Sequence, residues 1–340
     1  MERAAVLGAG AWGTALAIHL ARCGFRVLLW DRSPERAAAM QDARENPDYL
    51  PGVPFPDEVT VTADMASVAG CRRLVLAVPS AVLREVTTAV AGHADPESWV
   101  VCATKGLEEG SGKLAHEVMA EVLGEHAAGW AVLSGPSFAE EVGRGLPTAI
   151  TVAQPDLDRA EVLAAWFRCD PVRVYTSDDP VGVELGGAVK NVIAIAAGIA
   201  DGMGLGYNAR AALITRGLAE MSRLGVAWGG RAETFAGLTG LGDLVLTCTG
   251  PLSRNHQLGE TLGRGTAVER VPVALWRRAE GVRAARALHA KARELGVEMP
   301  ITEEVYRVLY EGEDPRQALH SLMHRSPKTE QPLSARDGQA

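Results

Sequence analysis

A glycine triplet near the N-terminus constrains the fold of this chain more than any other feature of its sequence. Gly8, Gly10 and Gly13 follow a short apolar run, residues 4–7, and lead into a helical stretch over residues 14–23. In a strand–turn–helix unit, the first glycine permits the tight turn and the second lets a pyrophosphate approach the backbone. The third lets the helix pack closely on the strand, and the positive end of the helix dipole then faces the anion.

A second apolar run, residues 27–30, ends at Asp31, eighteen residues after Gly13. An acid at about this distance accepts hydrogen bonds from the ribose in dinucleotide-binding units. A glycine triplet alone also occurs in turns of other α/β proteins, but here both strands and the acid accompany it. We therefore predict a dinucleotide-binding unit.

The overall charge argues against a nucleic-acid-binding protein. The chain of 340 residues carries a net charge of −8, whereas a nucleic-acid-binding surface is basic. An anionic substrate must therefore be held by a few placed lysine or arginine side chains. The length and the ordinary composition, with 47% hydrophobic and 22% charged residues, predict a soluble protein of two domains.

Cysteine spacing and apolar stretches indicate the compartment. The five cysteines are odd in number and include no CxxC pair, which predicts reduced thiols and no metal site. His320 and His324 lack a third ligand and are interpreted as surface residues of a helix. No signal-peptide pattern precedes the first strand, and the longest apolar stretch, residues 185–200, contains Lys190 and Asn191. We expect a cytoplasmic enzyme.

The first half of the chain alternates β-branched runs with helical stretches, which predicts an α/β fold with a doubly wound, mainly parallel sheet of the Rossmann type. The polar segment 176–180 predicts a boundary, after which an all-α domain follows. We expect a dinucleotide-binding domain over residues 1–178, a helical substrate-binding domain over 179–328 and a disordered tail over 329–340. The predicted strands are 4–7, 27–30, 59–62, 74–78, 99–103, 131–133, 149–152 and 172–175, and the predicted helices include 33–44, 81–91, 113–123 and 156–167.

Lys190 lies in an apolar helical segment, residues 188–197, where few other residues are polar. Burial disfavours an ammonium and lowers the pKa of a lysine, which suits proton transfer to or from an alcohol oxygen. The alternative is a lysine whose stem lies on the apolar surface while its amine reaches water. The dinucleotide-binding pattern before it favours the catalytic role.

Two further polar segments follow predicted strands. Lys105 comes directly after residues 99–103, near the edge where cofactor and substrate meet, although a surface lysine would fit the same pattern. Ser137 follows residues 131–133 and, with Glu140 three residues later, has the spacing of a capping box. Capping alone would explain this serine, but a helix start at the end of a strand also suits a polar substrate.

The helical half contains a second candidate group. A glycine-rich segment, residues 237–242, precedes Asp243, whose carboxylate accepts hydrogen bonds from hydroxyls. Ser253, Arg254 and Asn255 follow, and the planar fork of the arginine suits phosphate. Either segment alone would fit a helix cap and an exposed arginine.

Together these segments resemble one family, the bacterial NAD(P)-dependent glycerol-3-phosphate dehydrogenases. The resemblance implies hydride transfer with NAD(P)H between dihydroxyacetone phosphate and sn-glycerol 3-phosphate, which supplies phospholipid synthesis. It also implies a homo-oligomer, most often a dimer. The matching segments span nearly the whole chain in order: residues 8–17, 46–51, 104–107, 134–139, 189–192, 237–243, 253–255, 279–281 and 299–303.

The resemblance also implies roles for individual residues. Lys190 would exchange the proton, with Lys105 and Asp243 as further catalytic residues, and no metal is implied. Substrate contacts would come from Lys105, Gly135, Ser137, Lys190, Asp243, Ser253, Arg254 and Asn255. Cofactor contacts, counting the glycine turn and Asp31, would come from Gly8, Gly10, Ala11, Trp12, Gly13, Asp31, Arg32, Tyr49, Lys105, Ala139, Arg254 and Glu280.

Two positions bear on the choice between NAD and NADP, and a third departs from the family pattern. Asp31 would accept from the ribose 2′-OH and repel a 2′-phosphate, which favours NAD, whereas Arg32 favours NADP. Ala11 stands where the family commonly has serine, which removes one hydroxyl contact to a phosphate. The sequence leaves the preference open.

Two other functions are alternatives. A two-domain hydroxy-acid dehydrogenase would use Arg254 to hold a carboxylate in place of a phosphate. An NAD(P)-binding redox sensor would need no proton donor, so Lys190, Lys105 and Asp243 together argue against it.

Overall fold

The structure is a computed structural model, which describes residues 2–326. The chain divides into two compact units between Gly187 and Ala188, within one long helix. The predicted fold class is confirmed: the first unit contains a mostly parallel sheet flanked by helices, and the described part of the second is helical. The predicted tail, residues 329–340, lies outside the described residues.

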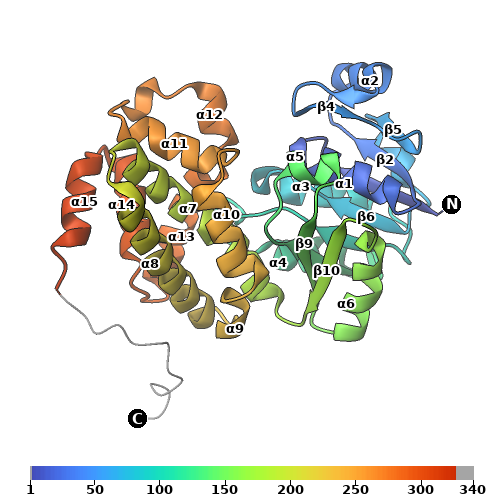
Figure 1. The fold of residues 1–340 in the computed structure, drawn as a ribbon. Coiled ribbons are helices and arrows are strands. Elements are labelled where there is room, and N and C mark those ends of the chain that lie inside the picture. The colour runs from blue at the N-terminus through green and yellow to red at the C-terminus, as the bar shows by residue number, and fades with distance from the viewer. Residues whose placement is uncertain (1, 327–340) are drawn as a thin grey trace, which may run out of the picture. The chain divides into compact units, whose positions relative to one another are not determined.

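An eight-stranded sheet forms the centre of the first unit (Figure 1). Its strands lie in the order β10, β9, β8, β7, β6, β1, β2 and β5. Each predicted strand is present within two residues of its predicted bounds. The observed bounds are β1 (Arg3–Leu7), β2 (Arg26–Trp30), β5 (Val59–Thr62), β6 (Arg73–Leu76), β7 (Trp99–Cys102), β8 (Gly129–Ser134), β9 (Thr148–Ala153) and β10 (Val172–Ser177).

The order of strands switches direction at β1, the strand that the glycine turn follows. From β1 the chain adds β2 and β5 on one side, and β6 then pairs with the other side of β1. Open α/β sheets bind ligands beyond the carboxyl ends of their strands at such a switch point. The topology therefore puts the glycine turn where a ligand is expected.

Alternate side chains of β1 enter two apolar cores, one on each face of the sheet. Ala4 and Val6 pack in a core with α1 (Ala11–Arg22), whereas Ala5 and Leu7 pack in a core with α3 (Leu83–Ala91) and α4 (Ala115–Leu123). Because both faces of these parallel strands are covered, the strands read as continuous apolar runs without alternation.

Two features of the first unit lie outside the predicted pattern. A small antiparallel pair, β3 (Glu45–Asn46) and β4 (Leu50–Pro54), follows α2 (Pro34–Ala43). In addition, β9 pairs antiparallel with β8 and parallel with β10, so the last two strands run against the others. The composition of a single strand does not encode its direction. The helices α5 (Ala139–Arg144) and α6 (Leu157–Ala164) complete this unit.

The prediction that all cysteines are reduced is wrong for one pair. Cys23 and Cys169 form a disulfide, and their Cα atoms are 5.4 Å apart. The two cysteines are 146 residues apart in sequence, and only the packing of the end of α1 against the segment before β10 brings them together. Cys71, Cys102 and Cys248 are buried free thiols, and burial raises the pKa of Cys102 and of Cys248 to about 12.

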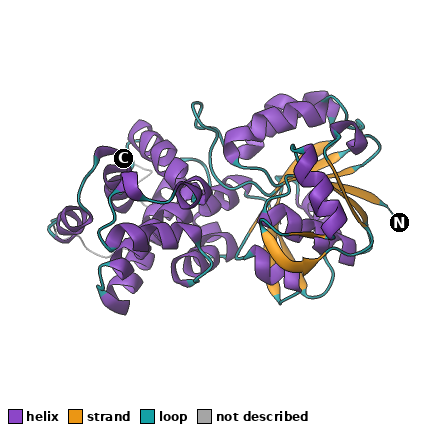
Figure 2. Ribbon diagram, turned by 90° about the horizontal axis from the view of Figure 1, so that it is seen from above, coloured by secondary structure: helices purple, strands orange, loops and turns teal. Residues whose placement is uncertain are grey.

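The described part of the second unit consists of helices and turns, and all strands in Figure 2 belong to the first unit. The long helix α7 (Pro180–Gly202) crosses the boundary between the units. The other helices are α8 (Gly206–Ala227), α9 (Ala232–Phe235), α10 (Asp243–Thr249), α11 (Arg254–Gly263), α12 (Val273–Arg278), α13 (Glu280–Glu294), α14 (Pro300–Tyr306) and α15 (Pro315–Met323).

The backbones of α7 and α11 touch at glycines on both helices. A Cβ atom on Gly198 or Gly202 would lie 2.1 or 2.4 Å from a carbonyl oxygen of α11. A Cβ atom on Gly259 or Gly263 would lie 2.1 or 2.2 Å from a carbonyl oxygen of α7. Since no side chain fits at these distances, only glycine permits this crossing, and the crossing fixes the two helices against each other.

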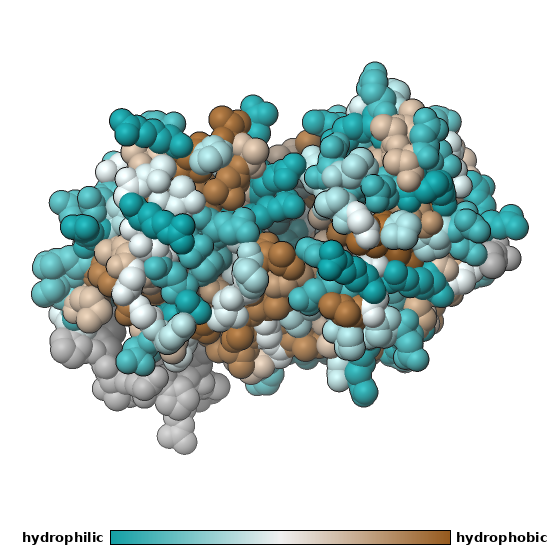
Figure 3. Space-filling view, turned by 45° about the horizontal axis from the view of Figure 1, so that its top comes forward, coloured by the Kyte–Doolittle hydropathy of each residue, from teal (hydrophilic) through white to brown (hydrophobic). Residues whose placement is uncertain are grey.

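The helix α7 is long and apolar enough to cross a membrane, but its surroundings show that it is a core helix. Within the protein, 94% of its most apolar stretch is buried. On the face shown in Figure 3, hydrophilic side chains are spread widely with apolar ones among them. The protein is therefore soluble.

A buried carboxylate in the second unit makes stability depend on pH. Glu220 of α8 accepts hydrogen bonds from the backbone N–H groups of Ile301 (2.6 Å) and Thr302 (3.2 Å), which caps the start of α14. Burial raises the pKa of Glu220 to about 7 from 4.5. Between pH 4.5 and about pH 7 the unfolded chain has released the Glu220 proton, whereas the folded protein still holds it. Protonated Glu220 therefore stabilises the fold fully below about pH 4.5, and this stabilisation is lost as pH rises through about 7.

We expect Glu220→Gln to remove this dependence. The free energy of unfolding of the unmodified protein should fall, relative to the variant, by about 3 kcal/mol between pH 4.5 and pH 8. Urea denaturation of both proteins across this range measures the difference. Glu269→Gln, which removes an exposed carboxylate of the same unit, is the control. If the free energy of unfolding depends on pH in the same way in the Glu220→Gln variant and in the unmodified protein, Glu220 is not the group responsible.

Candidate active site

The glycine turn has the shape of a phosphate-binding turn. Gly8 adopts a φ of +112°, and a Cβ atom there would lie 2.6 Å from the carbonyl oxygen of Ala77, just after β6. A Cβ atom on Gly13 would lie 1.9 Å from the carbonyl oxygen of Gly8, so α1 packs directly on the turn. A Cβ atom on Gly10 would meet nothing within 4 Å, so the backbone there is open. These three environments are the ones that dinucleotide binding requires.

Two neighbouring residues support the same ligand. Asn46 donates from Nδ2 to the carbonyl oxygen of Ala9 (2.9 Å) and to Oγ1 of Thr14 (2.8 Å), which ties β3 to the turn. Among the described residues, Nε1 of Trp12 is buried and has no hydrogen-bond partner. Buried donors are nearly always paired, so an orphaned donor beside an open turn fits a site that a polar ligand completes.

Asp31 is buried directly after β2 and is paired. Its Oδ1 accepts from the backbone N–H of Ser33 (2.9 Å), and its Oδ2 forms an ion pair with Arg36. The guanidinium of Arg36 also lies 5.0 Å from the centre of the Tyr49 ring. Arg32 is exposed. Arg36, which the sequence analysis missed, therefore offsets the charge of Asp31 and lies beside a second predicted cofactor contact.

Lys105, Gly135 and Ser137 meet at the carboxyl ends of β7 and β8. The carbonyl oxygen of Gly135 accepts from Nζ of Lys105 (3.2 Å) and from Oγ of Ser137 (3.0 Å). The prediction of a capping box at Ser137 is wrong, because α5 begins at Ala139 with Phe138 as its N-cap. Ser137 thus lies before the helix, where its hydroxyl bonds the chain just after β8.

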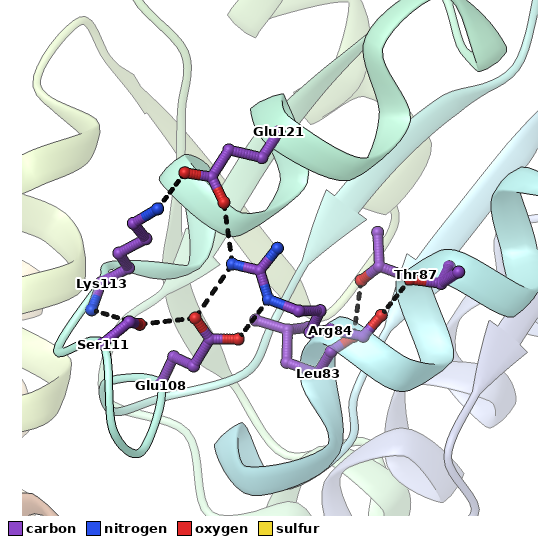
Figure 4. A network of polar contacts seen from close by, with 8 residues as sticks. Leu83, Arg84, Thr87, Glu108, Ser111, Lys113 and Glu121 are labelled. Carbon is purple, nitrogen blue, oxygen red and sulfur yellow. Dashed lines mark hydrogen bonds and ion pairs between the residues drawn. The ribbon is translucent and has the colours of Figure 1, made fainter.

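An ion-pair network braces the loop that follows Lys105 (Figure 4). Arg84 of α3 donates to Glu108 of the loop (2.7 Å) and to Glu121 of α4 (2.8 Å), and Lys113 also pairs with Glu121. The hydrogen bond from Arg84 lowers the pKa of Glu108. Since Glu108 is three residues after Lys105, the network holds this part of the chain against α3 and α4.

Lys190 is buried in the second unit beside two acceptors. Its Nζ donates to Oγ1 of Thr247 (3.0 Å) and forms an ion pair with Asp243. The hydroxyl of Thr247 donates to the carbonyl oxygen of Asp243 (2.6 Å), so its lone pairs face the amine. Lys190 is 6% exposed, which excludes the alternative of an amine that reaches bulk water.

The start of α11 carries the predicted anion-binding residues. Ser253 is the N-cap, and its Oγ accepts a backbone N–H of the first turn at 3.2 Å. Arg254 follows as the first helical residue and is half-buried. Asn255 donates from Nδ2 to Oδ1 of Asn191 (2.9 Å) and accepts from the backbone N–H of Gly281 (2.9 Å). Asn255 therefore links α7, α11 and α13.

Three predicted cofactor residues are each the first residue of a helix. Ala11 begins α1, Ala139 begins α5 and Glu280 begins α13, and all three are half-buried. Helix starts carry unpaired N–H groups and partial positive charge, which suits the phosphates of a dinucleotide.

The sequence analysis missed four residues that contact the predicted site residues: Asn46, Arg36, Asn191 and Thr247. Thr247 lies four residues after Asp243 on one helix, and this spacing could have revealed it. Asn46 and Asn191 lie within the quoted segments 46–51 and 189–192 without an assigned role. No signal in the sequence marked Arg36, because its ion-pair partner Asp31 lies before α2, the helix that contains Arg36.

One unit contains a sheet with an open glycine turn, and the described part of the other is helical and contains a buried lysine–aspartate pair. These features define a class, the pyridine-nucleotide-dependent dehydrogenases built from a nucleotide-binding unit and a helical unit. Comparison with known families narrows this class. The model of the NAD-dependent glycerol-3-phosphate dehydrogenase N-terminus matches residues 3–160, and that of the C-terminus matches residues 179–320. The chain belongs to the family of NAD-dependent glycerol-3-phosphate dehydrogenases.

Individual relatives agree over nearly the whole length. The chain is 54% identical to the glycerol-3-phosphate dehydrogenase, NAD(P)+, of Thioalkalivibrio sulfidiphilus, over 96% of this chain and 98% of that one. It is 50% identical to the enzyme of the same name from Nitrosococcus oceani, over 96% and 95%. The crystal structure of glycerol-3-phosphate dehydrogenase from Coxiella burnetii is similar in fold, with a TM-score of 0.90 and 44% identity over 95% of this chain and 99% of that one.

Proposed function

We propose a residue-level account of the reaction that family membership assigns to this chain, the interconversion of sn-glycerol 3-phosphate and dihydroxyacetone phosphate with NAD(P). Glycerol 3-phosphate is a precursor of phospholipids, so we assign the chain to phospholipid synthesis. When bound, the reduced nicotinamide supplies the hydride that the ketone carbon accepts. The remaining chemistry falls to the side chains.

Lys190 exchanges the proton. As hydride reaches the ketone carbon, negative charge grows on the oxygen, and a positioned ammonium stabilises that charge and donates its proton. In the reverse direction the neutral amine accepts the alcohol proton. Asp243 and Thr247 hold the amine in place, which is supported by the contacts of Lys190 with both. This buried cluster is the observation that carries the proposal.

Arg254 holds the substrate phosphate, with Ser253, Asn255 and the start of α11. A guanidinium matches two phosphate oxygens with parallel hydrogen bonds, and a helix start adds favourable dipole charge. Lys105 orients the carbonyl, with Gly135 and Ser137 as further substrate contacts. This role is supported by the hydrogen bonds that Lys105 and Ser137 both make to Gly135.

The cofactor is held by the glycine turn and the residues around it. The turn is supported as the pyrophosphate site by its open Gly10 and by the orphaned Nε1 of Trp12. Asp31, Arg32 and Tyr49 bind the adenosine ribose end. Further contacts come from Ala11, Lys105, Ala139, Arg254 and Glu280.

A substrate panel tests the proposed function. With NADH or NADPH, dihydroxyacetone phosphate should cause nucleotide oxidation, measured as loss of nicotinamide absorbance, and ketones that carry a carboxylate in place of the phosphate should not. Preferred turnover of a 2-oxo acid would support the hydroxy-acid dehydrogenase alternative. Absence of oxidation with every ketone would support the sensor alternative.

We predict that Asp31 and Arg36 set the preference between the two cofactors. Asp31→Asn should raise the NADPH-to-NADH ratio of kcat/KM by about tenfold, because it removes a charge that repels a 2′-phosphate and leaves Arg36 able to pair with it. Arg36→Ala should lower the same ratio by a similar factor. Steady-state kinetics with both cofactors measure the effect, and Arg26→Ala, an exposed arginine of β2, is the control. Equal ratios in all four proteins would exclude this pair from cofactor selection.

We also propose a cytoplasmic homodimer, with the functional boundary near residue 178. The compartment is supported by the soluble fold and the biosynthetic reaction, and the dimer by the family resemblance. The boundary is supported by the two family matches, which end at residue 160 and begin at residue 179.

A further inference from the structure

A group of metal-binding side chains lies in the first unit, outside the residues used in the proposed reaction. His19 and Cys23 lie one turn apart at the end of α1, and Cys169 lies in the segment before β10. One donor atom from each residue lies within 4.8 Å of the other two. The sequence predicted no metal site because no two cysteines have CxxC spacing. The fold supplies the proximity that the spacing lacks.

The imidazole of His19 is held in an orientation that suits a ligand. Its ring is buried, and Nε2 lies 2.8 Å from the carbonyl oxygen of Phe167. A carbonyl oxygen only accepts, so Nε2 carries the hydrogen and Nδ1 keeps a lone pair. Nδ1 lies 3.9 Å from Sγ of Cys169. Metal-binding histidines commonly donate their second N–H to a backbone carbonyl in this way.

We propose that reduction of the Cys23–Cys169 disulfide converts this group into a site for one thiophilic cation of the Zn²⁺ type. Two thiolates and one imidazole are a donor set that Zn²⁺ prefers, with a water in the fourth position. Tetrahedral bond lengths put a sulfur and a nitrogen ligand about 3.6 Å apart. Cys169 Sγ lies 3.9 Å from Nδ1 of His19, which is already near that separation, and the donor atoms of all three residues lie within 4.8 Å of one another.

The conversion needs a reductant. A dithiol gives two electrons and two protons to the disulfide, which yields two cysteine thiols and the oxidised cyclic disulfide of the reductant. The cation then replaces the two thiol protons, and the sulfurs move apart to about 3.8 Å to share it. Cys23 and Cys169 are half-buried, so both reagents have access.

The cation would replace the cross-link that the disulfide makes. In the oxidised protein the disulfide ties the end of α1 to the segment before β10. In the reduced protein a cation bound by His19, Cys23 and Cys169 ties the same two segments. The end of the helix that starts at the glycine turn is therefore held in both redox states.

Cobalt binding tests the site in the full chain. The protein is reduced under anaerobic conditions with dithiothreitol, freed of reductant by gel filtration and titrated with Co²⁺. We expect the thiolate-to-cobalt charge-transfer band and the visible bands of a tetrahedral site, saturating at one Co²⁺ per chain and lost when Zn²⁺ is added. The oxidised protein should show neither band.

Variants separate this site from other thiols. Cys23→Ser and Cys169→Ser should each abolish the charge-transfer band, and His19→Gln should weaken Co²⁺ binding at least tenfold. Cys71→Ala removes a buried thiol outside the group and should leave the spectrum unchanged. Circular dichroism and bound-nucleotide fluorescence check that each variant is folded. A reduced protein without the band, or an unchanged band in either serine variant, would overturn the proposal.

Discussion

Replacing Lys190 by alanine is expected to lower kcat for reduction of dihydroxyacetone phosphate by about 10²- to 10⁴-fold, the usual contribution of a positioned acid–base group. Binding of NADH should stay near normal, because the glycine turn and the residues proposed to bind the ribose belong to the first unit. Single-turnover kinetics and nucleotide fluorescence measure the two quantities separately. Near-normal kcat in this variant would remove Lys190 from the reaction.

The Lys190→Ala variant needs a control for folding. It leaves Asp243 buried without its cation, and breaking a buried ion pair in this way costs about 3–5 kcal/mol. The double variant Lys190→Ala with Asp243→Ala removes both charges and should fold better while staying equally slow. Lys291→Ala removes a lysine that pairs with Glu294 on α13 and should keep normal kcat. Recovery of kcat in the double variant would indicate that the single variant was merely unstable.

Replacing Arg254 by alanine is expected to raise KM for dihydroxyacetone phosphate by about 10- to 150-fold, since a hydrogen bond to a charged group contributes about 1.5–3 kcal/mol. The kcat/KM for dihydroxyacetone, which lacks the phosphate, should change little. Steady-state kinetics with both ketones distinguish phosphate binding from a general effect on the reaction.

The arginine that directly follows α11 serves as the matched control. Arg264 follows the same helix and pairs with Glu260, and Arg264→Ala should leave KM unchanged. Arg254→Lys should restore part of the affinity, because a lysine keeps the charge but loses the paired hydrogen bonds. If Arg254→Ala affects both ketones equally, the arginine does not belong to the phosphate site.

Local patterns were sufficient to predict much of the first unit. Parallel strands buried on both faces read as apolar runs, and a glycine turn must follow one of them, so β1, α1 and β2 were found together. The direction of β9 was not predictable, because it depends on which neighbour a strand pairs with rather than on its own residues.

Contacts between distant residues explain what the sequence could not give. Lys190 and Asp243 were singled out separately, but their ion pair depends on how α7 and α10 pack. The same limit applies to Cys23 and Cys169, and to the hydrogen bonds that the amide of Asn255, a predicted substrate contact, makes with Asn191 and Gly281. The type of a residue indicates which interactions its side chain can make, whereas the packing of the helices and strands decides which partner it meets.

The glycine crossing of α7 and α11 bears on which molecules the protein accepts. A shift of either helix along the other would drive carbonyl oxygens into α-carbons, so Lys190 on one helix and Arg254 on the other keep a constant separation. With Lys190 at the reacting oxygen and Arg254 at the phosphate, as proposed, this fixed separation would select substrates by their length. Under these proposed roles, a phosphoester with one carbon more or fewer is expected to meet one of the two groups and miss the other, however tightly its anion is held.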